Sequence, residues 1–440
     1  MSIARSRLIV VATFLGFVIA TAARGTGPFR WDAAHYWAAT QAMVGALPAV
    51  PDGYWELRGI FTSLIYAPAA TLTRVTGDEH AGWSVLLQNS IVLAAAAVFL
   101  VPAVVRIWRP VTPLMLVLGA GLLWAVTSGF AAYPLVDLYS ALGILGLLIL
   151  MRSDRRWVLL LAGVLAGVAA NIRPGYLVII VLLALVAVIW KHLSGLFVPA
   201  GIAVAMAPQV VMNAIRSGTL SPLPAGSDEL VALQAGYASY IVRYDTMISD
   251  ESARQFYCSP SMATLVGDSP PQSGGELALT LLQNIPNSLG FSFEKIGASL
   301  AWHLGVPYSA PVRAIDVAYG IGITAIATVG IVALFFAATR RIDDKRDRFG
   351  IAVLAAIVAG ASLTLVSSAT ETRFALILVL IGVIGLTVSV GGRPAELWRT
   401  GRWWVVAAVI IAGAALVVGA IGVSHPAPRG DVTTAICVST

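Results

Sequence analysis

The sequence predicts an all-α, polytopic membrane protein with about eleven transmembrane helices. Only 11% of its 440 residues are charged, whereas a soluble domain usually carries about 25%. Apolar stretches of roughly 20 residues, enough to cross a bilayer, recur along the whole chain. The expected spans are residues 8–23, 83–105, 112–130, 134–151, 157–171, 175–190, 194–213, 314–339, 349–369, 372–390 and 403–423.

The distribution of charge predicts the orientation of these spans. With the N-terminus inside, most Lys and Arg residues fall in the inner segments and most Asp and Glu residues in the outer ones. This asymmetry follows the positive-inside rule. We therefore expect a multi-pass protein of the cytoplasmic (plasma) membrane, and the pI near 9.5 then reflects topology rather than nucleic-acid binding.

The first outer stretch, residues 24–82, follows the first span. That span also fits a signal peptide, and on either reading residues 24–82 are extracytoplasmic. Two amphipathic segments in it begin at Asp32 and Ile60. Both are too short or too mixed to cross, so we expect two juxtamembrane helices that lie along the interface.

The second outer stretch, residues 214–313, is a long loop that separates two groups of spans. Its aromatic and apolar content predicts an ordered lid, because a loop of this length in a compact protein is usually functional or disordered. The expected organisation is a transmembrane module over 1–213, the loop 214–313, and a transmembrane module over 314–440 that ends in a short extracytoplasmic tail.

The sharpest motif is RWDAAHYW, from Arg30 to Trp37. In a helix that starts at Asp32, the side chains of Asp32, His35 and Tyr36 share one face. A carboxylate there could act as a general base toward an acceptor hydroxyl, or hold Mg²⁺ or Mn²⁺ that positions a phosphate. The alternative is a helix start without a chemical role, since Asp is a favoured N-cap. His35 alone also fits a packed or interfacial histidine.

Four more charged residues are expected at the outer ends of spans: Asp137, Arg173, Glu371 and Arg373. A carboxylate at the edge of a charge-free span indicates function, so Asp137 and Glu371 are candidates for binding an acceptor or, for Asp137, a cation. Arginine suits bidentate phosphate contact, which makes Arg173 and Arg373 candidate phosphate ligands. Each residue also has a reading without a chemical role. Asp137 could simply interact favourably with the helix dipole, Arg173 could flank a span at the membrane interface, and Glu371 and Arg373 could belong to a polar turn.

Several outer residues are weaker candidates for substrate contacts. They are Arg58, Arg243, Tyr244, Asp245, Arg254, Lys295 and His303. Cys258 and Cys437 also fall outside, where a disulfide is allowed, although the sequence gives no distance between them. No glycine-rich nucleotide-binding motif follows a strand pattern, so a nucleotide is not an expected partner, just as the pI does not indicate a nucleic acid.

The order of these signals resembles the GT-C superfamily of integral-membrane glycosyltransferases, which use polyprenyl-phosphate sugars. The matching features are Asp32 on a helix after the first span, a second interfacial helix from Glu56 to Pro68, Asp137 opening a span, a Gly-rich span ending at Arg173-Pro174, and the Glu371-Thr372-Arg373-Phe374 turn. Trp31-Asp32 with His35-Tyr36 is also similar to the Trp-Asp motif of GPI-type mannosyltransferases.

The resemblance implies a donor at the outer leaflet, Asp32 as general base, and Arg173 and Arg373 on the lipid phosphate. We therefore expect an inverting glycosyltransferase that moves one sugar, mannose, from a polyprenyl-phosphate carrier to an extracytoplasmic envelope glycan, glycolipid or other acceptor. The first loop has no Asp-Asp or Asp-x-Asp pair, which leaves metal dependence open. The alternatives are a lipid-linked glycan polymerase or ligase, a transporter or lipid flippase, and a non-catalytic assembly protein; almost wholly apolar mid-span positions argue against transport.

Overall fold

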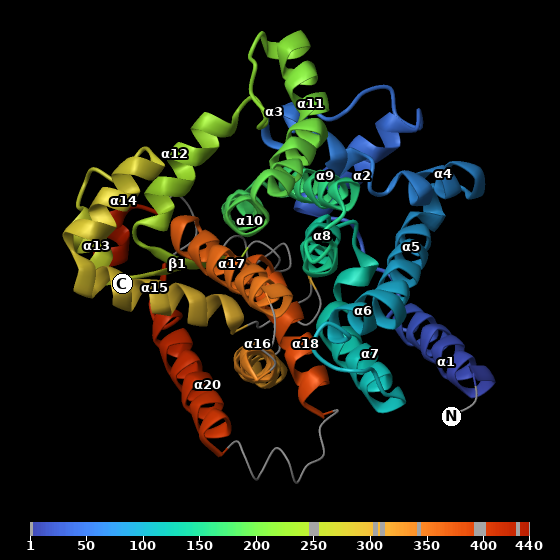
Figure 1. The fold of residues 1–440 in the computed structure, drawn as a ribbon. Coiled ribbons are helices and arrows are strands. Elements are labelled where there is room, and N and C mark those ends of the chain that lie inside the picture. Colours follow the sequence, from blue (N-terminus) through green and yellow to red (C-terminus); the bar gives the residue numbers. More distant parts are fainter. Residues whose placement is uncertain are drawn as a thin grey trace.

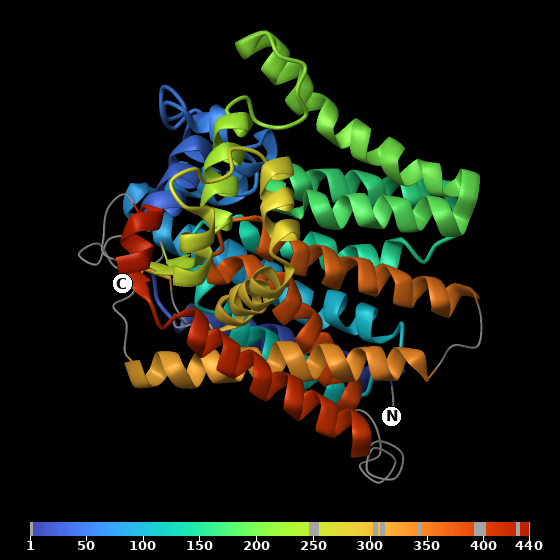
Figure 2. The same ribbon diagram turned by 90° about the vertical axis from the view of Figure 1, so that its left-hand side faces the viewer.

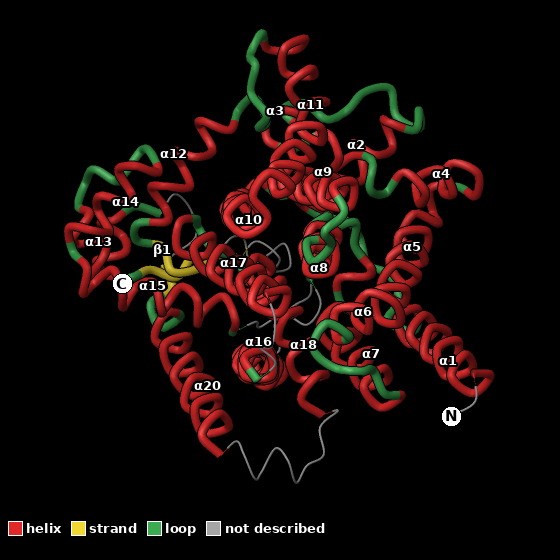
Figure 3. The backbone as a smooth tube through the Cα atoms, viewed as in Figure 1, coloured by secondary structure: helices red, strands yellow, loops and turns green. Residues whose placement is uncertain are grey.

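The computed structural model describes residues 3–245, 255–301, 307–308, 313–340, 345–390, 402–427 and 432–439. Within these residues the chain is predominantly helical, with one small sheet (Figure 3). The helical membrane-protein class is thus confirmed. The small sheet is an addition that the sequence did not predict, because its strands are too short to produce a recognisable alternating pattern.

The first half of the chain is helical throughout. Its helices are α1 (Ile3–Ala22), α2 (Trp31–Met43), α3 (Tyr54–Leu57), α4 (Ala67–Thr76), α5 (Ala81–Ala95), α6 (Val101–Val105), α7 (Pro113–Thr127), α8 (Asp137–Leu150), α9 (Arg156–Ile172), α10 (Leu177–Lys191) and α11 (Phe197–Ser217). The second expected interfacial helix is split, because a 3₁₀ turn over Ile60–Ser63 precedes α4 and Pro68 stands in the first turn of α4.

The second half adds the sheet and further helices. Its elements are α12 (Ser227–Ala238), β1 (Ile241–Asp245), β2 (Gln255–Cys258), α13 (Pro260–Val266), α14 (Gly274–Gln283), α15 (Ile285–Leu300), α16 (Arg313–Thr339), α17 (Lys345–Ser367), α18 (Leu376–Val390), α20 (Arg402–Gly422), β3 (Pro426–Ala427) and α21 (Thr434–Ser439).

Six helical stretches in the described residues are long and apolar enough to cross a membrane. They are Asp78–Val105, Pro174–Ser217, Ala314–Thr339, Asp347–Ser367, Thr372–Val390 and Trp403–Gly422. The expected count of eleven is therefore not confirmed. Shorter apolar helices account for much of the difference: α8, for example, has 14 residues, which is about 21 Å of helix against a hydrocarbon core of about 30 Å.

The long helices run side by side. In Figure 1 α8, α10 and α16 are seen end on, and Figure 2 shows them from the side. Figure 2 also shows that the N-terminus and the C-terminal ends of α10 and α16 lie at one end of the bundle. The segments α2, α12, β1 and α21 lie at the opposite end, together with the C-terminus. The described parts of the two expected outer stretches therefore share one end of the molecule.

Small residues allow the closest helix contacts. A Cβ on Gly330 of α16 would overlap the backbone of Gly382 in α18, and a Cβ on Gly163 of α9 would overlap the backbone of α11 near Gly201. Such contacts through small residues are typical of helices packed in lipid. They fix the bundle on which the loop segments rest.

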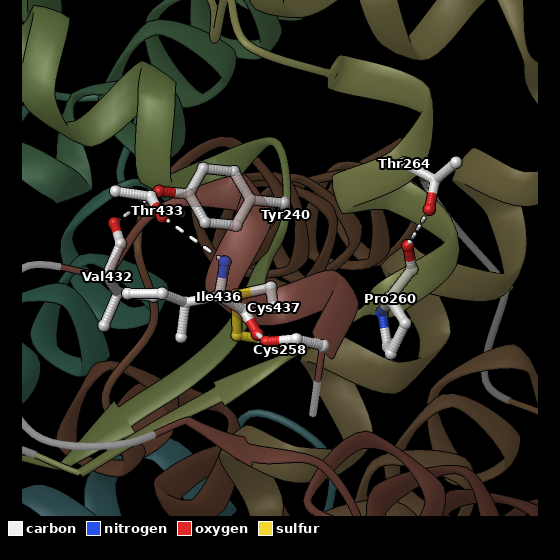
Figure 4. Close-up of a disulfide and its surroundings, with 9 residues drawn as sticks. Tyr240, Cys258, Pro260, Thr264, Val432, Thr433, Ile436 and Cys437 are labelled. Carbon is white, nitrogen blue, oxygen red and sulfur yellow. Dashed lines mark hydrogen bonds between the residues drawn. A yellow bond between two sulfur atoms is a disulfide. The ribbon is translucent and has the colours of Figure 1, made fainter.

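The large loop and the C-terminal tail fold together at the loop end. Strand β2 pairs antiparallel with both β1 and β3. A disulfide between Cys258 and Cys437 joins β2 to α21 (Figure 4), which settles the pairing that the sequence left open. The Tyr240 hydroxyl also donates to the Val432 carbonyl at 2.9 Å. The tail therefore packs with the loop.

Candidate functional site

A cavity of about 700 Å³ lies at the loop end of the bundle. Its lining includes residues of α2, α3, α9, α10, α12, α14 and α17, of the strands β1 and β2, and of the turns before α10 and α18. The polar lining includes Asp32, His35, Tyr36, Glu56, Arg58, Arg173, Gln234, Tyr244, Glu371 and Arg373. The apolar lining includes Leu57, Ile172, Leu177, Val178, Leu230, Val231 and Phe374. Charged groups from distant parts of the sequence thus share one cavity with a large apolar surface.

Asp32 lies between two arginines in this cavity. Its Oδ1 accepts a hydrogen bond from Nη2 of Arg58 at 2.6 Å, and its Oδ2 accepts one from Nη2 of Arg373 at 2.6 Å. The Asp32 side chain remains about one-fifth exposed, whereas Arg373 is 6% exposed. The carboxylate is therefore held from both sides and still faces the cavity.

Arg373 extends this ion pair into a network deeper in the protein. Its Nη1 lies 3.5 Å from Oδ2 of Asp137, and its Nε donates to the carboxylate of Glu371. Arg173 donates to the other Asp137 oxygen. Among the described residues, three arginines (58, 173 and 373) and three carboxylates (32, 137 and 371) thus form one network of ion pairs, whose formal charges cancel.

The start of α2 determines where Asp32 points. The N-cap of this helix is Arg30, so Asp32 is the second residue of the first turn, and the N-cap alternative for Asp32 is wrong. Trp31 before it has a φ of 48°, a left-handed conformation that costs about 1–3 kcal/mol in a non-glycine residue and clusters at functional sites. The cavity is lined by Asp32 together with His35 and Tyr36, the face that their spacing predicts.

The charges around Asp32 decide its protonation. Burial by itself raises the pKa of the Asp32 carboxyl. The Arg58 and Arg373 guanidiniums outweigh this effect and hold the pKa well below its usual value. Asp32 is therefore ionised at neutral pH. For Arg173, burial and then repulsion from Arg373 lower the pKa, so the two buried cations disfavour each other.

A chain of buried amides fixes the turn that carries Arg58. The Phe61 N–H donates to Oδ1 of Asn171 at 3.0 Å, and the Ile60 N–H donates to Oε1 of Gln209 at 2.9 Å. The same Gln209 oxygen accepts from Nδ2 of Asn171 at 3.0 Å. Since unpaired buried polar groups are costly, these bonds hold the turn against the end of α9.

Gly59 allows this turn to come close to Asn171. A Cβ at Gly59 would overlap the Asn171 backbone carbonyl. Asn171 is two residues before Arg173, and Gly59 directly follows Arg58. The close approach therefore brings two arginines, from the first loop and from the end of α9, to the same cavity.

Asp137 does not reach the cavity, which corrects its expected role in binding an acceptor. It is the first residue of α8 and is 1% exposed. Both of its oxygens face arginines, Arg173 and Arg373. Asp137 therefore lies outside the cavity lining and positions the guanidiniums of Arg173 and Arg373.

Two candidate loop contacts are also buried away from the cavity lining. Arg243 in β1 donates to the carbonyls of Ala298 and Ala301, and it pairs with Asp245 at 3.1 Å. Lys295 is fully buried in α15, and its Nζ donates to three backbone carbonyls, those of Ala238, Val366 and Ser368. Arg243 thus joins β1 to the end of α15, and Lys295 joins α15 to α12 and to the end of α17. His303 and Arg254 lie outside the described residues.

Two features of the site were not expected from the sequence. Arg58 was one of several weak loop candidates, yet it is a direct partner of Asp32. Glu371 and Arg373 would point apart in a regular helix, but Glu371 is extended (φ −112°, ψ 156°) and a 3₁₀ turn begins at Thr372. This local geometry brings the two side chains together.

The residues present do not fit a metal ion. No group of three His, Cys, Asp or Glu side chains in the described residues is placed to hold one. Asp32 and Asp137, the candidate ligands, are each paired with arginines, whose positive charge opposes a divalent cation at the same oxygens.

Comparison with family models, with curated proteins and with solved structures finds no match to this chain. The geometry and charge of the cavity are therefore the evidence on function.

Proposed function

We propose that the chain is an inverting glycosyltransferase that moves a sugar from a polyprenyl-phosphate carrier to an acceptor. One observation carries this proposal: a partly exposed carboxylate, Asp32, lies 2.6 Å from the guanidiniums of Arg58 and Arg373 in a cavity that Arg173 also lines. Transfer from a phosphate carrier requires a base for the acceptor hydroxyl and cations for the leaving phosphate. Both kinds of group meet here.

The arginines are suited to the phosphate of the donor. A guanidinium contacts phosphate oxygens in a bidentate manner and keeps its charge when buried. A phosphate in the cavity would also add negative charge beside Arg173 and Arg373, two buried cations that repel each other. Apolar residues of α10 and α12 in the same lining, such as Leu177 and Val231, suit a prenyl chain.

Asp32 is the proposed base. As the acceptor oxygen attacks the anomeric carbon, its proton passes to the Asp32 carboxylate. The bond from the anomeric carbon to the phosphate oxygen breaks, and the lipid phosphate leaves with the electron pair. Attack from the face opposite the phosphate inverts the anomeric configuration.

Donor binding would activate this base. Both oxygens of Asp32 accept hydrogen bonds from arginines, which makes the carboxylate a weak base. A phosphate that draws Arg58 or Arg373 away removes part of the stabilisation of the ionised form, so the pKa of Asp32 rises. Proton transfer is then coupled to the presence of the donor.

We further propose mannose as the sugar, an envelope glycan or glycolipid as the acceptor, and an extracytoplasmic cavity in the plasma membrane. The Trp31-Asp32 motif supports mannose as the sugar. The charge distribution of the loops supports the extracytoplasmic location of the cavity.

The test is transfer by the purified protein from polyprenyl-phosphate mannose to a glycolipid acceptor. Asp32→Asn is expected to abolish turnover while donor binding persists. The matched control is Asp228→Asn, which changes an exposed aspartate in the first turn of α12. Wild-type turnover in Asp32→Asn would remove Asp32 from this role, and transfer of a whole lipid-linked glycan would favour a ligase.

A further inference from the structure

One face of α15 is apolar and bare. Ile285, Leu289 and Phe293 follow each other at intervals of four residues, so they lie along one side of the helix. Their exposed fractions are 53%, 54% and 59%. Leu279 and Leu282 of the preceding helix α14 are exposed as well.

The opposite face of α15 is packed against the protein. Phe291 is buried in the core that contains the sheet, and Ala298 belongs to the same core. Lys295 between them is fully buried. The helix is therefore firmly attached on one side, and its bare side is not a result of loose packing.

The bare face continues a surface that is suited to lipid. Helix α20 is a candidate span in which only 17% of the apolar window is buried. Gly297 of α15 meets Gly419 of α20 so closely that a Cβ on Gly297 would lie 2.8 Å from the Gly419 nitrogen. Val417 and Ile421, on either side of Gly419, are 60% and 50% exposed. In Figure 1, where α16 is seen end on, α15 lies across the bundle direction beside one end of α20.

We propose that α15 is an interfacial helix whose bare face inserts into the bilayer among the acyl chains of phospholipids. Leucine, isoleucine and phenylalanine offer no hydrogen bonds to a polar partner, and an amphipathic helix of this kind lies in the plane of the interface. This inference does not depend on the proposed glycosyltransferase activity.

Embedding α15 would also anchor the cavity in the membrane. Lys295 of α15 donates to the carbonyl of Ala238 at the end of α12 and to that of Ser368 beside the cavity. Helix α12 supplies much of the cavity lining. The depth of α15 in the bilayer therefore sets the depth of the cavity wall.

Site-directed spin labelling tests this proposal directly. The chain has two cysteines, and both are in the disulfide, so a single added cysteine can be labelled specifically. The variants are Leu289→Cys and Phe293→Cys, with Asp228→Cys as the exposed control, each reconstituted in phosphatidylcholine vesicles. The readout is the collision rate of the nitroxide with oxygen, which concentrates in lipid, and with a water-soluble nickel chelate.

Labels at positions 289 and 293 are expected to collide with oxygen at least threefold more than with the nickel chelate, and the label at 228 is expected to show the reverse. Nickel accessibility at 289 and 293 equal to that at 228 would overturn the proposal. Exclusion of both reagents would also overturn it, because another protein surface would then cover the face.

Discussion

If donor phosphate competes with Asp32 for the arginines, removing the charge of Asp32 should tighten binding of the lipid phosphate. The wild-type carboxylate makes two charged hydrogen bonds of 2.6 Å, and a phosphate must displace at least one of them. A hydrogen bond to a charged group contributes about 1.5–3 kcal/mol net. Because the Asp32 side chain is 21% exposed, solvent screening favours the lower end of this range. We therefore expect Asp32→Asn to bind polyprenyl phosphate about tenfold more tightly.

The assay is a titration of the purified protein in detergent with polyprenyl phosphate, followed by intrinsic tryptophan fluorescence. Arg58→Gln provides the opposite case, since it removes a proposed phosphate ligand and should weaken binding. Asp228→Asn is the control and should leave the dissociation constant unchanged. An Asp32→Asn variant that binds the phosphate equally well or more weakly would refute the competition, and with it the coupling between donor binding and base activation.

Three further predictions concern the stability of the scaffold. Gln209→Leu leaves the Ile60 N–H and the Asn171 amide without their acceptor, and each unpaired buried group costs about 1–3 kcal/mol; the thermal midpoint in detergent should fall. Gly59→Ala should also lower the midpoint, because its Cβ overlaps the Asn171 carbonyl. Burial lowers the pKa of Lys295 from 10.5 to about 7. The unfolded chain then binds more protons between these values, so the free energy of unfolding should rise from pH 7 to pH 10.5.

Matched variants separate these effects from general damage. Gln283→Leu changes an exposed glutamine, and Gly413→Ala adds a Cβ that meets nothing within 4 Å; both should keep the wild-type midpoint. Lys295→Met should remove the rise of stability between pH 7 and 10.5. A midpoint that rises with pH as steeply in Lys295→Met as in the wild type would exclude Lys295 as the source.

Sequence periodicity was sufficient where the site depends on local helix geometry. The spacing of Asp32, His35 and Tyr36 places their side chains on one face of α2, and all three line the cavity. The expected topology was sufficient to place Arg173 and Arg373 at a common depth, because both follow or precede apolar helices at their ends on one side of the bundle. The structure brings both of these arginines to the cavity that Asp32 lines.

Other features of the site and the fold depend on long-range packing, which the sequence alone does not show. The contact of Arg58 with Asp32 depends on a turn whose amides bond to Asn171 and Gln209, residues more than a hundred positions further along the chain. Strand β3 has two residues, too few for any pattern. The depth of Asp137 was also hidden, because a carboxylate at a helix start looks the same in sequence whether it faces a cavity or a buried arginine.

The most direct test of the central claim is a density map of the protein with a hydrolysis-resistant polyprenyl-phosphate sugar bound. The account predicts that the phosphate contacts at least two of Arg58, Arg173 and Arg373. It also predicts that Asp32 has left at least one arginine and faces the anomeric carbon. A phosphate bound elsewhere on the molecule, with Asp32 still held between Arg58 and Arg373, would contradict it.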